Sequence, residues 1–298
     1  MARMNTTCIL LPAAAALLLL SCGDQDAKND PKTPKEMYER ARALIQPNVE
    51  HDASDFEAAL EWTRKAAEAG YEQAQTDLGA LYMYGGKGVK QDAAQAYAWF
   101  SKAAEQGNQA AHMFLGDLLY FGKGVAQDTE AAFKEWRIAA DAGIAEAEYR
   151  LGHALVQADQ TASEGMAWLM KAARDGAKGG VALAACDLAN VYAKGRAGIE
   201  KDLHKAAHWF EVAANMGEPR AQYAYSLMLL TGNGIGQDVK KGESYLRMAA
   251  GQSLVPAIRV LITVMESSSD ADLHKEEIQA WKTRLNELEA ETVDVPSA

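Results

Sequence analysis

One segment of about 36 residues recurs along most of this chain, and this internal repeat constrains the fold more than any other feature of the sequence. The stretch YEQAQTDLGALYMYGGKGVKQDAAQAYAWFSKAAEQG is followed directly by NQAAHMFLGDLLYFGKGVAQDTEAAFKEWRIAADAG. Both copies carry a Leu-Gly pair, a glycine-rich stretch, an aspartate, aromatic residues and an alanine pair in the same order. Repeats of this length build arrays in which each unit packs on its neighbours. The sequence therefore predicts an elongated array rather than one central core.

Two sets of landmarks indicate two helices in each unit. The Leu-Gly pair occurs at Leu78-Gly79, Leu115-Gly116 and Leu151-Gly152, and fades to Leu188-Ala189 and Tyr225-Ser226. The alanine pairs are Ala66-Ala67, Ala103-Ala104, Ala139-Ala140, Ala172-Ala173, Ala213-Ala214 and Ala249-Ala250. Four positions before them stand Trp62, Trp99, Glu135, Trp168, Trp209 and Tyr245, and Trp281 continues the series. Because large residues then face small ones at helical spacing, this tryptophan ladder is expected to form the core.

The third unit departs from the pattern. The interval between ladder positions is 36 or 37 residues elsewhere, but it is 33 before Trp168 and 41 after it. The segment VQADQTASEG replaces the glycine-rich loop, and extra residues at 177–180 lengthen the next turn. We therefore expect a different turn and a local kink at this unit.

These features resemble the Sel1-like repeat, a relative of the tetratricopeptide repeat. The matching residues are the Leu-Gly pair, Tyr82, the G-x-G-V loops near Gly86–Val89 and at Gly122–Val125, Asp92, Asp128, Trp99 and the alanine pairs. The resemblance implies an all-α fold, an α-solenoid of antiparallel helix pairs. It places five repeats over residues 71–252. A degenerate repeat precedes them at 34–70, and a degenerate repeat, capping helix and tail follow at 253–298.

Polar residues mark the expected helix starts. An aspartate at the start of each second helix can accept hydrogen bonds from free backbone N–H groups; these are Asp55, Asp92, Asp128, Asp202 and Asp238. Thr33 and Glu36, with Pro34 between them, predict a capping box, and Ser54/Glu57 and Thr161/Glu164 repeat that spacing. Gly79 and Gly116 fall inside helices, which predicts that a neighbouring helix passes close to them.

The N-terminal segment reads as an export signal. Cys8 to Leu20 is an apolar run of about 20 Å as a helix, shorter than the roughly 30 Å needed to span a bilayer. The sequence Leu19-Leu20-Ser21-Cys22 resembles a bacterial lipobox, which implies a signal peptide at 1–21, lipid attachment at Cys22 and a flexible tether over 22–33. The alternative is an incidental cysteine near an ordinary cleavage site. Gly23 after the cysteine favours the outer membrane, facing the periplasm.

Composition and motifs argue against several function classes. The net charge of −11 disfavours a nucleic-acid partner. The glycine loops lack the Ser or Thr of a phosphate-binding loop. His204 and His208 are four residues apart but lack a third metal ligand nearby, so we expect exposed histidines. Cys186 is expected to be packed and inert. We therefore expect no catalytic residue, cofactor or metal, and a monomer.

The remaining candidate is a surface that binds a protein or peptide. The resemblance implies a concave groove lined by the first helix of each repeat. Its expected residues are Met83, Tyr84, Met113, Asp117, Tyr120, Phe121, Tyr149, His153, Asn190 and Tyr223. The chain is therefore interpreted as a membrane-tethered interaction scaffold of the cell envelope. An envelope hydrolase or penicillin-interacting protein, like the cysteine-rich Sel1 relatives, and a regulator or inhibitor of a secreted enzyme stay open as alternatives.

Overall fold

The computed structural model describes residues 31–46, 51–86, 88–174, 181–196, 198–268 and 271–293, and this part of the chain is all-α apart from two isolated β-bridges in loops. Cys22 and the predicted signal peptide lie outside the described residues. The helices are α1 (Pro34–Leu44), α2 (Ala53–Glu68), α3 (Glu72–Tyr84), α4 (Ala93–Glu105), α5 (Gln109–Phe121), α6 (Thr129–Asp141), α7 (Ala145–Leu155), α8 (Ala162–Arg174), α9 (Ala182–Lys194), α10 (Leu203–Asn215), α11 (Pro219–Thr231), α12 (Val239–Gly251), α13 (Val255–Glu266), the short 3-10 helix η2 (Ala271–His274) and α14 (Lys275–Val293).

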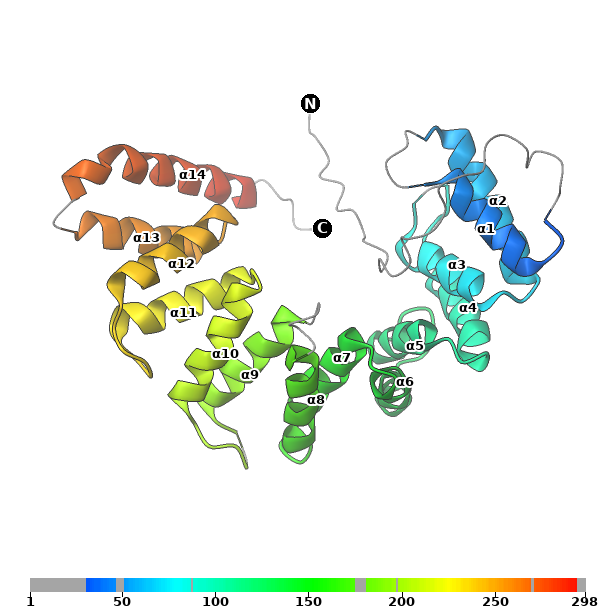
Figure 1. The fold of residues 1–298 in the computed structure, drawn as a ribbon, viewed down its shortest axis with the longest axis horizontal. Coiled ribbons are helices and arrows are strands. Elements are labelled where there is room, and N and C mark those ends of the chain that lie inside the picture. Colours follow the sequence, from blue (N-terminus) through cyan, green and yellow to red (C-terminus); the bar gives the residue numbers. More distant parts are fainter. Residues whose placement is uncertain are drawn as a thin grey trace, which may run out of the picture.

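Successive helices pack as antiparallel pairs, and each pair stacks on the next. The pairs are α1/α2, α3/α4, α5/α6, α7/α8, α9/α10, α11/α12 and α13/α14. Figure 1 shows the pairs following an open arc, with α1 and α2 at one end and α13 and α14 at the other. The α-solenoid predicted from the repeat is confirmed.

The core lies where the two helices of a unit cross. A Cβ atom added to Gly79 of α3 would lie 2.8 Å from the ring of Phe100 in α4, so the predicted close approach of a second helix is correct. Phe100 and its equivalents Trp136, Leu169, Phe210 and Leu246 are the large buried residues of the second helices. The glycine therefore makes room for a large side chain from the partner helix.

The tryptophan ladder packs against the core, as predicted, but it does not fill the centre. Trp99, Trp168 and Trp209 are half-buried, and each directly precedes a large buried residue. Adjacent residues on a helix are rotated by about 100°, so the ladder points to the edge of the interface rather than its centre. A lysine Nζ lies over the ring of Trp99 (Lys102, 4.1 Å) and of Trp168 (Lys171, 5.0 Å).

Most of the predicted caps are present. The carboxylates of Asp92, Asp128, Asp202 and Asp238 accept from the first backbone N–H groups of α4, α6, α10 and α12, and Thr33 and Glu36 form the predicted capping box. At α2 the N-cap is Asp52, and Asp55 is its reciprocal partner, so the assignments of Asp55 as N-cap and of Ser54/Glu57 were wrong. The Thr161 hydroxyl donates to the carbonyl oxygen of Leu155 instead, and Glu164 pairs with Arg137.

A glutamine before the capping aspartate closes the turn from the other side. The side-chain amide of Gln91 donates to the carbonyl oxygen of Met83 at 2.9 Å, and Gln127 and Gln237 repeat this bond to Tyr120 and Leu230. The Gln-Asp dipeptide thus satisfies the C-terminal end of one helix and the N-terminal start of the next. This role of the glutamine was not predicted.

The third unit keeps the helix pair without the glycine loop. Residues 156–161 join α7 to α8, and a Cβ atom on Gly152 would lie 2.9 Å from the backbone nitrogen of Leu169. In addition to its pairing with α8, α7 packs directly against α9. The different turn expected here is present. In the described residues no helix is long and apolar enough to cross a membrane.

Candidate functional site

The candidate site is the inner face of the arc, formed by the first helices of successive units. In Figure 1, α5 and α7 lie toward the opening of the arc, and α6 and α8 lie on its outer side. Side-chain contacts link neighbouring first helices along this face. The Tyr38 hydroxyl of α1, for example, donates to Asp77 of α3 at 2.6 Å. These contacts hold the inner face in one geometry.

Asp117 of α5 is the centre of a buried polar contact. Its Oδ1 accepts from Nε1 of Trp136 at 3.0 Å and from Nε of Arg150 at 2.7 Å. Burial raises the pKa of the Asp117 carboxyl, while the Arg150 guanidinium opposes that rise. Arg150 also pairs with Glu146 at 2.7 Å, so α5 and α7 are joined by a charged group with two carboxylate partners.

A second contact joins α7 to α9. Nδ1 of His153 lies 2.6 Å from Oδ2 of Asp187, and this hydrogen bond raises the pKa of His153 against the opposing effect of burial. The ring of Tyr149 lies 5.7 Å from the His153 ring. Burial, followed by the nearby charge of Asp187, raises the pKa of Tyr149 to about 12, so its hydroxyl is a neutral donor at physiological pH.

Two exposed aromatic residues lie at the C-terminal ends of α3 and α5. Tyr84 is 51% exposed and Phe121 is 62% exposed. They occupy equivalent positions in adjacent units, five residues after Gly79 and Gly116. The charges of Asp117, Arg150 and Glu146 act on the Tyr84 hydroxyl, whose pKa is raised mainly by burial. The two rings and the Asp117 contact therefore belong to one stretch of the inner face.

Several predicted groove residues take packing roles instead. Met113 and Asp117 are buried, so neither offers the free surface that was expected of it. Tyr120 turns toward α6, where its ring lies 5.0 Å from that of Trp136. Met83 and Tyr223 are half-buried and pack against neighbouring core clusters.

The predicted groove residues on α7 and α9 are more exposed. Asn190 and His153 are exposed, and Tyr149 is half-buried. The amide of Asn190 donates to Sγ of Cys186 at 3.8 Å. Tyr84, Asp117 and Tyr149 thus lie near the charges of Arg150 and Glu146, and His153 pairs with Asp187. Tyr120 packs against Trp136, and Tyr223 packs against a neighbouring core cluster.

Sequence reasoning missed Arg150, Glu146 and Asp187. The alignment of the repeats holds a signal for two of them. The residue directly after the Leu-Gly pair contacts the residue directly before that pair in the next unit, which joins Asp117 to Arg150 and His153 to Asp187. In both cases an acidic residue in one column of the repeat alignment stands opposite a basic residue in the other, and this signal is present in the sequence.

Cys186, the cysteine within the described residues, is not activated as a nucleophile. Cys186 is buried, and burial raises its pKa to about 11, whereas a catalytic thiol has a lowered pKa. His204 and His208 are exposed on α10, as expected. Within the described residues no group of three metal-ligating side chains comes together.

Comparison with known proteins identifies the repeat. The family model of the Sel1 repeat matches residues 49–71, 72–108, 109–144, 182–218 and 219–254, which is more than half of the chain. The chain belongs to the Sel1 repeat family. The stretch between 144 and 182 that the family model leaves unmatched contains the Sel1 unit without a glycine loop, which still folds as the α7/α8 pair.

Solved structures show the same fold. A protective antigen of uropathogenic Escherichia coli that displays an SLR fold is 26% identical with a TM-score of 0.73, and the match covers 86% of this chain and 54% of that one. This Sel1 repeat chain thus spans about half of the antigen's length. A Sel1 repeat protein from Oxalobacter formigenes is 24% identical with a TM-score of 0.69, over 86% of this chain and 100% of that one. No curated protein matches the chain in sequence.

Sel1 repeat proteins are generally protein-interaction scaffolds, and they bind protein partners. The fold is typically non-catalytic. The family therefore sets the class of function.

Proposed function

We propose that this protein is a membrane-tethered interaction scaffold of the bacterial cell envelope. A segment of a protein partner lies along the inner face from α3 to α9. The chain carries out no chemistry on that partner, and one solenoid acts as a monomer. Cys22 holds the scaffold at a membrane through its lipid, with the outer membrane, facing the periplasm, as the site.

The exposed pair Tyr84 and Phe121 carries the proposal. Exposed aromatic groups are enriched at the centres of protein interfaces, and truncating them commonly costs about 2 kcal/mol or more of binding energy. Phe121 stands on α5, which the Asp117–Arg150 ion pair joins to α7, and Tyr84 stands on α3, which the Tyr38–Asp77 hydrogen bond joins to α1. Because these contacts hold the helices before the partner arrives, little ordering is needed on binding.

The test is the double substitution Tyr84→Ala and Phe121→Ala. Crosslinking in the producing cells should join a partner to the wild type and not to this variant. Ile138→Ala with Met248→Ala is the matched control, because these side chains are 44% and 46% exposed on the second helices α6 and α12. Loss of the partner in the control but not in the first variant would assign binding to the outer face.

The tether has a separate test. A fatty acid label should enter the wild type and be absent from Cys22→Ala, and membrane fractionation should place the label with the outer membrane. Equal labelling of the two proteins would rule out lipid attachment at Cys22. This result is independent of the groove, since the tether and the solenoid are different parts of the chain.

A further inference from the structure

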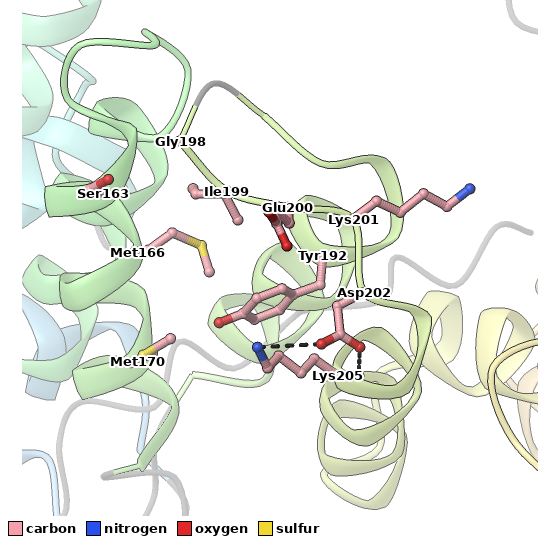
Figure 2. Close-up of a pocket in the computed structure, with 10 residues that line it drawn as sticks. All are labelled: Ser163, Met166, Met170, Tyr192, Gly198, Ile199, Glu200, Lys201, Asp202 and Lys205. Carbon is pink, nitrogen blue, oxygen red and sulfur yellow. Dashed lines mark hydrogen bonds and ion pairs between the residues drawn. The ribbon is translucent and has the colours of Figure 1, made fainter.

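A pocket of about 350 Å³ lies on the other side of the solenoid, where the third unit meets the fourth. Figure 2 shows Met166 and Met170 of α8 facing Tyr192 of α9 across it, with Lys205 of α10 at its edge. Ile199, from the loop between α9 and α10, completes the apolar part of the lining. The pocket is separate from the inner face described above.

Second helices of adjacent units are joined by ion pairs at three other junctions. Arg137 of α6 pairs with Glu164 of α8 at 2.6 Å. Glu211 of α10 pairs with Lys241 of α12 at 2.8 Å, and Arg247 of α12 pairs with Glu277 of α14 at 3.0 Å. In each case the first residue directly follows the large buried residue of its helix, Trp136, Phe210 or Leu246.

At the junction of α8 with α10 this pattern is broken. Met170 follows the buried Leu169 and so stands where Glu211 stands one unit later, and Lys205 stands where Lys241 stands. Lys205 therefore faces a thioether instead of a carboxylate. Its Nζ turns back to Asp202 of its own helix at 3.3 Å and lies 5.3 Å from the centre of the Tyr192 ring.

At this junction Gly198 does not approach the preceding second helix closely. A Cβ atom on Gly198 would meet nothing closer than the Ser163 hydroxyl at 4.0 Å. One unit later, a Cβ atom on Gly234 would lie 2.7 Å from Leu203, so that loop closes on the preceding helix. The loop at 195–202 is also one residue longer than the loop at 232–238. The lining methionines are side chains that adapt to varied apolar ligands.

We propose that this pocket binds a segment of a protein partner that carries a carboxylate next to an apolar side chain. The carboxylate takes the place that Glu211 occupies at the next junction and pairs with Lys205. The apolar side chain packs between Met166, Met170 and Tyr192. Charge-assisted hydrogen bonds of this kind are stronger than neutral ones. The scaffold thus has a second recognition site on its outer side.

The probe is the heptapeptide Gly-Ser-Glu-Phe-Glu-Ser-Gly, added to the full chain with labelled methionine methyl groups. The NMR signals of Met166 and Met170 should shift on titration, while that of Met265, buried between α13 and α14, stays unchanged. Met170→Glu supplies the missing carboxylate from within the chain, and Lys205→Gln removes its partner. Each should weaken binding of the peptide by about tenfold or more.

Glu211→Met is the matched control, because it removes the carboxylate at the next junction and should leave the peptide's affinity for the pocket unchanged. Peptides with glutamine for both glutamates, or alanine for phenylalanine, should bind at least about tenfold more weakly. No shift of Met166 and Met170 with the wild type, or an unchanged affinity of Met170→Glu, would overturn the proposal. If free phenylacetate shifts the signals as strongly as the peptide, the ligand is a small carboxylic acid and the protein segment is rejected.

Discussion

At the scale of single residues, polar side chains inside this solenoid are placed as matched pairs, and the members of a pair vary from unit to unit. Gln75 accepts from Gln106 and donates to the carbonyl oxygen of Ala67, and Gln222 does the same with Gln252 and Ala214. The equivalent residue of the third unit is Glu148, which is fully buried, with Nζ of Lys171 at 2.8 Å. Lys171 also donates to the carbonyl oxygen of Ala140. A neutral pair has thus been replaced by a charged one.

The Glu148–Lys171 pair makes a sharp prediction. Lys171→Met should destabilise the chain by about 3–5 kcal/mol, because it leaves a carboxylate buried without a compensating charge. Adding Glu148→Gln should recover most of that loss, since the amide restores the residue that the first and fifth units carry at this position, Gln75 and Gln222. Urea denaturation of the single and double variants measures both steps. An additive effect of the two substitutions would show that the pair is not coupled.

His153 predicts a dependence of stability on pH. Its pKa is raised in the folded protein by the hydrogen bond to Asp187, so the contact stabilises the fold fully below the unfolded pKa of about 6.5. The contribution disappears as the pH rises through the raised pKa of the folded state. Asp187→Asn should therefore destabilise the chain more at about pH 5.5 than at about pH 9, and should lower the pKa of His153 measured by NMR. A stability difference that is equal at both pH values would contradict this assignment.

At the scale of helices, the repeat alone determined the pairing and most of the caps. The pattern of large residues does not fix which face of each second helix meets its partner, because Trp99 and Phe100 are adjacent and either could face the partner helix. Gly79 decides between them, since a Cβ atom at this position would lie 2.8 Å from the Phe100 ring. The inner face was harder to predict. Tyr120 and Phe121 are likewise adjacent, and only the three-dimensional packing shows that Tyr120 contacts Trp136 while Phe121 stays exposed.

The corrected orientation can be tested by comparing Phe100→Ala with Trp99→Ala. Phe100 is completely buried, so its truncation leaves a cavity and should cost about 3–5 kcal/mol. Trp99 is half-buried beneath Lys102, so part of its ring stays in contact with water in the folded state and its loss should cost less. Urea denaturation midpoints rank the two variants. A larger loss of unfolding free energy for Trp99→Ala than for Phe100→Ala would show that the tryptophans, not Phe100 and its equivalents, occupy the centre of the core.

At the scale of the whole molecule, the buried apolar residues of the described chain fall into five successive clusters along the arc. Phe100 belongs to the cluster of α4 and α5, whereas Leu246 and Ile258 belong to the cluster near α13. Contacts between helices run mainly from each helix to the next. Stability in such arrays is approximately a sum of unit and neighbour terms, so damage at one place need not unfold the rest.

Hydrogen exchange of Phe100→Ala should therefore show a local effect. Backbone amides of α3 to α6 should lose protection, because their units share the damaged cluster or border it. Amides of α10 to α13 should keep the protection of the wild type, since their clusters contain no atom that touches the cavity. Leu246→Ala is the mirror-image control and should loosen α11 to α13 while sparing α3 to α6. Uniform loss of protection along the chain in both variants would mean that the solenoid unfolds as one cooperative unit. In that case the junctions, the open one at α8 and α10 included, couple the units more strongly than their separate clusters indicate.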